Sequence, residues 1–206
     1  MNNAINFEGN EIVPSKIVCV GRNYVDHINE LGNEMPEEPV IFIKPNSAIS
    51  NHVYTNKICE IHYEAEMSFL INKGGIVGVG FGFDLTKRSV QSKLKEKGLP
   101  WERAKAFDNS AVFSKFVTVT QDISGLRMEL YINGLLKQNA NYQLMINKPT
   151  SLIHEINSFM TLVDGDVVMS GTPSGVGVLN YGDQMLGKIY NNSKLLVECS
   201  WTVKTI

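Results

Sequence analysis

The chain alternates short apolar runs with clusters of glycine, proline, asparagine and aspartate, a pattern typical of a protein built mainly from β-strands. The runs that predict strands are residues 16–20, 40–43, 64–71, 75–83, 111–119, 127–132, 166–170, 184–189 and 195–204. Asn133 and Gly134 follow one such run, and both tolerate positive φ. They therefore predict a tight hairpin turn.

Helical periodicity is confined to three segments. Residues 23–31 predict a short helix ending at Gly32, and residues 86–97 predict another, with Thr86 as its N-cap. Residues 149–160 repeat apolar side chains at helical spacing, which predicts an amphipathic helix on the core. No repeat or linker divides the chain. We therefore expect one β-rich α+β domain over residues 1–206, with residues 1–15 as an N-terminal lead-in.

Composition narrows the classes of function. A formal net charge of -2 gives no basic surface for nucleic acid. No apolar run approaches the roughly 18 residues that span a bilayer, and the first eight residues lack the charge and apolar pattern of a signal peptide. Cys19, Cys59 and Cys199 are scattered and odd in number, which favours free thiols in a reducing compartment. We expect a cytoplasmic protein that binds neither nucleic acid nor membrane.

Two glutamates stand one residue apart in the run 64–71. Side chains alternate along a strand, so Glu64 and Glu66 should point the same way. Two buried carboxylates side by side need a positive charge between them, and Asp84, at the end of the next run, offers a third. All-oxygen ligands select a hard cation such as Mg²⁺, Mn²⁺ or Ca²⁺. The pattern also fits solvent-facing glutamates and an aspartate that caps a helix.

Two further groups could carry chemistry. His27 and Glu30 lie three residues apart and would share a helix face, so the carboxylate could orient the imidazole as a general base or form a simple surface salt bridge. Lys105 stands among small and aromatic residues, which suits an enclosed ammonium or a surface lysine. The glycine-rich loop 170–177 would let a ligand approach backbone N–H groups, although it lacks the lysine of a P-loop. Glycines 78, 80 and 82 have the wrong spacing for a dinucleotide fingerprint.

Several stretches, in this order along the chain, together resemble the fumarylacetoacetate hydrolase family, in particular its small single-domain acylpyruvase and isomerase-like branch. They are residues 21–24 with His27 and Glu30, residues 39–45, 62–66 and 84–91, residues 98–101 with Lys105, and the loop 170–177. Each stretch alone is weak evidence, but the ordered set is specific and covers most of the chain.

The resemblance implies a mixed β-sandwich roll, a homodimer and a small 2-oxo acid substrate. It implies Mg²⁺ or Mn²⁺ at Glu64, Glu66 and Asp84, with Ca²⁺ as a substitute in crystals. His27 and Glu30 become a water-activating pair on a lid at residues 22–35. The positions that match substrate-contacting residues of the family are Lys105, Arg88, Gln91 and Thr172 at the 2-oxo acid end and Arg22 and Tyr24 along the pocket.

The chain departs from the family pattern at two places. Ser89 stands where close relatives often carry aspartate, and residues 72–75 replace a longer excursion that can line the dimer or the pocket edge. Both departures leave the substrate range open.

The favoured function is metal-dependent hydrolysis of a carbon–carbon bond in a fumarylpyruvate- or acetylpyruvate-like β-diketo acid, through a pyruvate enolate, as in the catabolism of aromatic compounds. Oxaloacetate decarboxylation and isomerisation of 2-hydroxyhepta-2,4-diene-1,7-dioate use the same kind of site. Hydrolysis needs the His27–Glu30 pair to activate water, whereas decarboxylation does not. A non-catalytic roll with a structural Ca²⁺ would need neither this pair nor Lys105.

Overall fold

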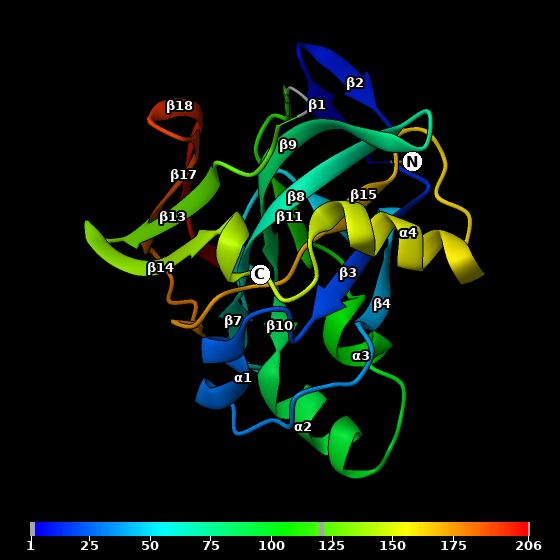
Figure 1. Ribbon diagram of the computed structural model, residues 1–206. Coiled ribbons are helices and arrows are strands. Elements are labelled where there is room, and N and C mark those ends of the chain that lie inside the picture. The colour runs from blue at the N-terminus through cyan, green and yellow to red at the C-terminus, as the bar shows by residue number, and fades with distance from the viewer. Residues whose placement is uncertain (1–2, 120–121, 206) are drawn as a thin grey trace.

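The computed structural model describes residues 3–119 and 122–205 (Figure 1). The strands are β1 (Ile5–Phe7), β2 (Asn10–Ile12), β3 (Lys16–Gly21), β4 (Val40–Pro45), β5 (Ile49–Ser50), β6 (Tyr54–Thr55), β7 (Ile61–Tyr63), β8 (Ala65–Asn72), β9 (Gly75–Asp84), β10 (Thr86–Lys87), β11 (Ala111–Phe113), β12 (Val117–Thr118), β13 (Leu126–Ile132), β14 (Leu135–Asn141), β15 (Val167–Met169), β16 (Gly177–Val178), β17 (Gln184–Asn191), β18 (Lys194–Thr202) and β19 (Lys204–Thr205). The helices are α1 (Val25–Glu30), α2 (Arg88–Glu96), α3 (Glu102–Lys105) and α4 (Pro149–Phe159), with 3-10 turns η1 (Asn46–Ala48) and η2 (Tyr142–Leu144).

Two sheets enclose the main core. The larger runs in the order β4-β3-β15-β8-β9-β11-β5, with β12 also paired to β9, and the smaller runs β14-β13-β17-β18. Met67 and Phe81 from the larger sheet share one apolar cluster with Leu130 and Val197 from the smaller. Because β15 pairs parallel with β3 and antiparallel with β8, the larger sheet is mixed. The expected β-rich α+β fold, a mixed β-sandwich roll, is confirmed.

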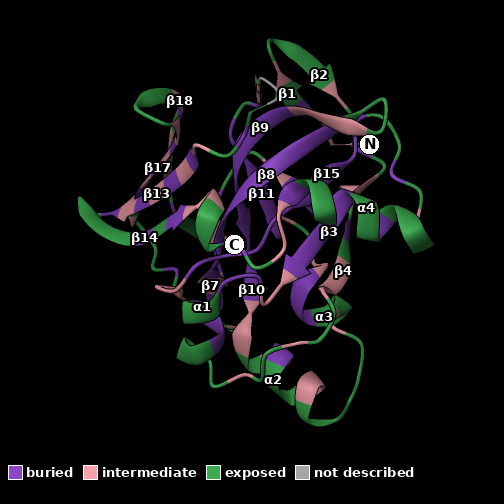
Figure 2. Ribbon diagram, in the orientation of Figure 1, coloured by how far each residue is buried: buried purple, intermediate pink, exposed green. Residues whose placement is uncertain are grey.

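The central hairpin β8–β9 is buried along most of its length (Figure 2). Its alternating glycines serve packing, because a Cβ at Gly82 would lie 2.3 Å from the Ser68 hydroxyl and one at Gly80 would lie 3.0 Å from the Phe116 ring. Phe81 and Phe83, on the opposite face of β9, contact Trp201 of β18. The glycines therefore let a second apolar layer approach the back of β9.

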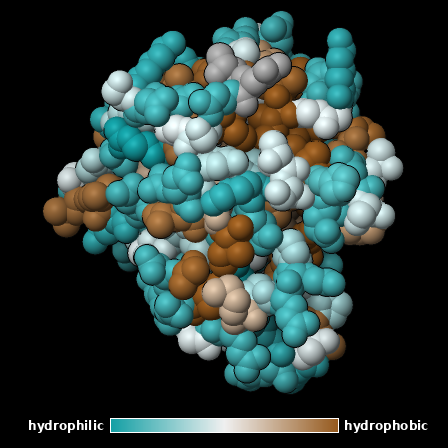
Figure 3. All heavy atoms as spheres, viewed as in Figure 1, coloured by the Kyte–Doolittle hydropathy of each residue, from teal (hydrophilic) through white to brown (hydrophobic). Residues whose placement is uncertain are grey.

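The helices occupy distinct places in the fold. α1, α2 and α3 gather with β7 and β10 at one end of the molecule (Figure 1). α4 instead packs through Ile153 and Ile156 against Val18, Ile71 and Val168 of the large sheet. No helix within the described ranges is long and apolar enough to cross a membrane. The face seen in Figure 3 is mainly hydrophilic, with separate apolar patches.

Several expected boundaries are wrong. Glu64 lies between β7 and β8 rather than inside a strand, and the run 111–119 is broken between β11 and β12. Thr86 is not an N-cap: it belongs to β10, and α2 starts at Arg88 without a side-chain cap.

The prediction of the hairpin at Asn133 and Gly134 and that of the last helix both agree with the structure. Asn133 and Gly134 have φ values of 52° and 79°, so the predicted hairpin is confirmed. The helix expected at 149–160 forms as α4. Residues 5–12 of the lead-in form the hairpin β1–β2, and residues 1–2 lie outside the described ranges.

Candidate metal centre and active site

The structure brings Glu64, Glu66 and Asp84 together, with one carboxylate oxygen of each within 4.8 Å of the others. All three are buried, at 5%, 1% and 1% exposure. Glu64 directly precedes β8, Glu66 lies in β8, and Asp84 ends the paired strand β9. The Asp84 amide donates to the Glu64 carbonyl at 2.9 Å, so strand pairing sets their separation.

Three cations surround these carboxylates. The Lys105 ammonium lies 2.8 Å from Glu64 Oε2 and 2.7 Å from Asp84 Oδ2. Lys44 Nζ lies 2.8 Å from the other oxygen of Asp84. Arg88 pairs with Glu64 through its guanidinium. Lys105 is therefore an enclosed ammonium, not a surface lysine.

The pKa shifts show which carboxyl lacks positive charge. Burial would raise the pKa of Glu64, but Lys105 and Arg88 outweigh it and hold that pKa below its usual range. Burial raises the pKa of Glu66, and the carboxylates of Asp84 and Glu64 raise it further. Burial would lower the pKa of Lys105, but Asp84 and Glu64 raise it.

Glu66 is thus the carboxyl whose charge is least compensated. Its carboxylate accepts a hydrogen bond of 2.7 Å from the neutral Gly171 amide. A divalent ion between Glu66 and the other two carboxylates would supply the missing charge. The donor set, three converging carboxylates without sulfur or imidazole, fits Mg²⁺ or Mn²⁺.

His27 and Glu30 also meet. His27 Nδ1 lies 3.2 Å from Glu30 Oε2, and the imidazole is buried. With Nδ1–H donating to the carboxylate, Nε2 is left as the basic nitrogen. Glu30 Oε1 accepts a hydrogen bond of 2.9 Å from the amide of Gly175, in the glycine-rich loop. One carboxylate therefore joins the histidine of α1 to this loop.

A narrow cavity of about 40 Å³ lies beside these groups, and Glu64 is the one carboxylate of the three in its lining. The lining also includes His27, Arg88, Gln91, Lys105 and Arg22. Residues 22–35 cover it. Asn33 Oδ1 accepts a hydrogen bond of 2.5 Å from Lys95 of α2, and Arg22 donates to the Glu34 carbonyl at 3.2 Å. This volume suits only a few waters at most, so a substrate needs a rearrangement of the residues that line the cavity.

Two expected substrate residues do not line this cavity. The Thr172 hydroxyl donates to the Ala65 carbonyl at 2.9 Å and accepts from Gln138 Nε2 at 2.8 Å, so it supports β8. Tyr24 borders a separate cavity of about 90 Å³ beside Pro173. Its hydroxyl is buried without a hydrogen-bond partner in the described part of the chain, and burial and Glu66 raise its pKa.

Sequence reasoning missed two supporting residues. Lys44 is fully buried. The feature that could have indicated its role is its position, as a charged residue within the mainly apolar strand β4. Asn23, also fully buried, donates to the Ser170 carbonyl at 2.8 Å and the Asn147 carbonyl at 3.0 Å. Nothing in the pattern marked Asn23 as the anchor of the covering segment, because its partners are distant in sequence.

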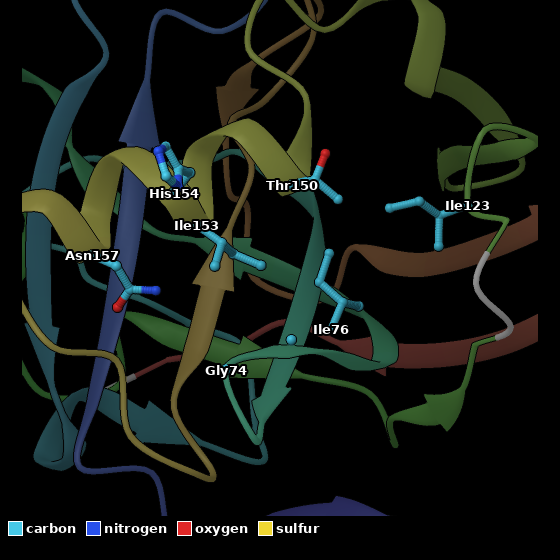
Figure 4. Close-up of a pocket in the computed structure, with 8 residues that line it drawn as sticks. Gly74, Ile76, Ile123, Thr150, Ile153, His154 and Asn157 are labelled. Carbon is cyan, nitrogen blue, oxygen red and sulfur yellow. The ribbon is translucent and has the colours of Figure 1, made fainter.

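A larger cavity, of about 450 Å³, lies between α4 and the β8–β9 turn (Figure 4). It is lined by Gly74, Gly75, Ile76, Ile123, Thr150, Ile153, His154 and Asn157. It holds no carboxylate and shares no residue with the carboxylate cavity. The short 72–75 segment thus borders this second cavity and not the carboxylate site.

Comparison with known proteins places the chain among characterised relatives. Residues 16–200 match the family model for the fumarylacetoacetate (FAA) hydrolase C-terminal domain. The chain is 41% identical over 189 residues to oxaloacetate tautomerase YcgM of Escherichia coli, covering 83% of this chain and 86% of that protein. It is 36% identical over 186 residues to the mitochondrial oxaloacetate tautomerase FAHD1 of Mus musculus, covering 82% and 84%.

Solved structures agree with this placement. A fumarylacetoacetate isomerase/hydrolase-like protein from Oleispira antarctica superposes with a TM-score of 0.92 at 35% identity, covering 98% of this chain and 99% of that one. Fumarylpyruvate hydrolase from Pseudomonas aeruginosa, in complex with Mn²⁺ and pyruvate, superposes with a TM-score of 0.89 at 29% identity, covering 100% and 97%.

Proposed function

Because the chain belongs to the fumarylacetoacetate hydrolase family, we propose that it is a divalent-metal-dependent enzyme that interconverts the keto and enol forms of oxaloacetate. The relatives from E. coli and Mus musculus, both called oxaloacetate tautomerases, support this substrate. The observation that carries the proposal is a cluster of three buried carboxylates, one of which, Glu64, lines a cavity together with His27, Lys105 and Arg88.

Glu64, Glu66 and Asp84 are the residues that would hold Mg²⁺ or Mn²⁺. When bound, such an ion supplies Lewis acidity that polarises the 2-oxo group of the substrate. Lys105 and Arg88 add fixed positive charge beside the place where the carbonyl oxygen becomes negative.

His27 is the proposed base. Its Nε2 takes a proton from C3 of the keto acid, and the C3–H electron pair forms the C2=C3 double bond while the carbonyl π electrons move to oxygen. The protonated His27 returns this proton to the oxygen, which completes the enol and restores the neutral imidazole, and the reverse steps regenerate the ketone. Glu30 stabilises the imidazolium through Nδ1–H, at 3.2 Å.

Carbon–carbon hydrolysis of an acylpyruvate is the second candidate. The family resemblance of the sequence favours it, and the Pseudomonas fumarylpyruvate hydrolase supports it. There His27 would take a proton from water instead of carbon. The two oxaloacetate relatives are more similar in sequence, at 41% and 36% against 29% identity, so we place tautomerisation first.

The test is to follow oxaloacetate and acetylpyruvate separately by NMR with Mg²⁺ or Mn²⁺, and with EDTA as the control. We expect metal-dependent acceleration of keto–enol exchange without enzymatic release of pyruvate. Release of pyruvate and acetate from acetylpyruvate as the only activity would favour the hydrolase. Release of pyruvate and CO₂ from oxaloacetate would favour the decarboxylase, and absence of metal-dependent turnover on both substrates would refute all three.

A further inference from the structure

Two cations at the cavity lack the carboxylate partners that their neighbours have. Lys105 and Arg88 are each ion-paired with Glu64. Lys95 and Arg22 also line the cavity, but across residues 3–119 and 122–205 neither has a carboxylate within ion-pairing distance. Lys95 donates to the Asn33 amide oxygen and Arg22 to the Glu34 carbonyl, and both acceptors are neutral.

The charges on these side chains repel one another. Burial lowers the pKa of Lys95, and Arg22 and then Arg88 lower it further, because each cation disfavours another nearby. Glu64 raises the pKa of Lys95, but the two carboxylate oxygens of Glu64 already contact Arg88 and Lys105. An anionic group bound beside Lys95 would relieve the repulsion that remains.

The backbone at Arg22 is also unusual. Its φ of 57° is in the left-handed region, which is unfavourable for a residue with a side chain. Arg22 directly follows β3, and the covering segment begins there. Such conformations persist where the surrounding structure enforces them, often at binding sites. Here the turn brings a guanidinium to the same cavity as Lys95.

We propose that Lys95, assisted by Arg22, binds the second carboxylate of a dicarboxylic 2-oxo acid and thereby selects such acids over acylpyruvates with a neutral tail. The inference rests on the proposed function, which places the 2-oxo acid end at the carboxylate cluster with Lys105 and Arg88. Lys95 and Arg22 are then the cations of the cavity that remain for the second carboxylate of the substrate. The substrate carboxylate replaces the Asn33 amide oxygen as the acceptor for Lys95.

The test compares Lys95→Met with Lys93→Met, a control on the same helix whose side chain is exposed and outside the cavity. We expect Lys95→Met to raise the KM for oxaloacetate about 10–100-fold, the loss typical of a charge-assisted hydrogen bond. The inhibition constant of pyruvate, which lacks the second carboxylate, should change less than about twofold, within the scatter of surface substitutions. Lys95→Arg should restore part of the oxaloacetate affinity.

The outcomes separate the two proposals. Equal weakening of oxaloacetate and pyruvate by Lys95→Met, or an unchanged KM for oxaloacetate, would overturn the role of Lys95 alone. An effect of Lys93→Met as large as that of Lys95→Met would show a general loss of helix charge and would also overturn it. A wild-type enzyme without oxaloacetate turnover would overturn the proposed function, and this inference with it.

Discussion

His27 contacts the Glu30 carboxylate through Nδ1, and its imidazole is buried beside the cavity. This geometry suits proton transfer. We expect His27→Ala to lower kcat for oxaloacetate tautomerisation by about 10²–10⁴-fold, the usual contribution of a positioned base. His154→Ala is the control, because that histidine is exposed and lines the other cavity. Steady-state kinetics at saturating Mg²⁺ measure both variants, and wild-type kcat in His27→Ala would remove the base from the mechanism.

Lys44 balances the negative charge of Asp84 in the protein interior. Its ammonium lies 2.8 Å from Asp84 Oδ1 and donates to the backbone carbonyls of Leu85 and Lys105. Removing one partner of a buried ion pair leaves the other charge uncompensated. We therefore expect Lys44→Met to lower the free energy of unfolding by about 3–5 kcal/mol, measured by urea denaturation.

The control for Lys44→Met is Lys93→Met, which removes the same group from an exposed position. The free energy of unfolding of Lys93→Met should stay within about 0.5 kcal/mol of the wild-type value. Equal stability of both variants would mean that Lys105 alone compensates Asp84.

At the scale of elements, the glycine-rich loop meets α1 and β14 at Gly175. Gly175 has a φ of 96°, and a Cβ there would lie 2.0 Å from the Lys137 carbonyl oxygen. Gly175→Ala must therefore shift the loop and displace the amide that holds Glu30. We expect a loss of both stability and kcat, because the Glu30 carboxylate would no longer be fixed beside His27.

Gly182→Ala is the matched control for this prediction. Gly182 has a similar φ of 86°, but nothing lies within 4 Å of its Cβ position. Gly182→Ala should lower the free energy of unfolding by about 1–2 kcal/mol through backbone strain alone, and it should leave kcat unchanged. Thermal unfolding and kinetics of the pair separate strain from displacement, and equal kcat values in the two variants would contradict the role of the Gly175 amide.

Asp166 ties the starts of β3 and β15 together. Its buried carboxylate accepts hydrogen bonds from Lys16 Nζ, the Ser15 hydroxyl and the Val163 amide. Burial would raise the pKa of Asp166, but these donors outweigh it and lower that pKa below its usual value.

An aspartate with a lowered folded-state pKa stabilises the fold at neutral pH and loses this effect as pH falls from about 4 through the folded-state pKa. Asp166→Asn should therefore lower the free energy of unfolding by about 1–3 kcal/mol at pH 7. The difference from the wild type should shrink in acid, as urea denaturation across pH will show. A difference that does not change with pH would mean that the carboxylate charge is not what matters.

The sequence predicted the long elements well and the short ones poorly. β8, β9, β17 and α4 carry strong periodicity, so their presence was readable. Two-residue strands such as β10 and β16 have no periodic signal, because they depend on partners distant in the chain. Glu64, Glu66 and Asp84 were recognisable as a group, because Glu66 lies in β8, Glu64 directly precedes it, and Asp84 ends the paired strand β9. Lys44 and Asn23 were not, because their partners become neighbours only through tertiary packing.

At the scale of the whole molecule, a divalent ion should stabilise the fold. Binding to the folded state alone adds about 2.7 kcal/mol at a hundredfold excess over Kd. We expect Mg²⁺ or Mn²⁺ to raise Tm, EDTA to reverse the rise, and Glu66→Ala to abolish it. A metal-induced Tm shift that survives in Glu66→Ala would place the ion elsewhere. The homodimer and the lid role of residues 22–35 stay predictions from the family resemblance.

Lys105 holds Glu64 and Asp84 together at 2.8 Å and 2.7 Å with an ammonium of their own chain. This internal counter-ion draws two of the three carboxylates together without a metal. Folding of the chain and binding of the proposed divalent ion are therefore separable steps.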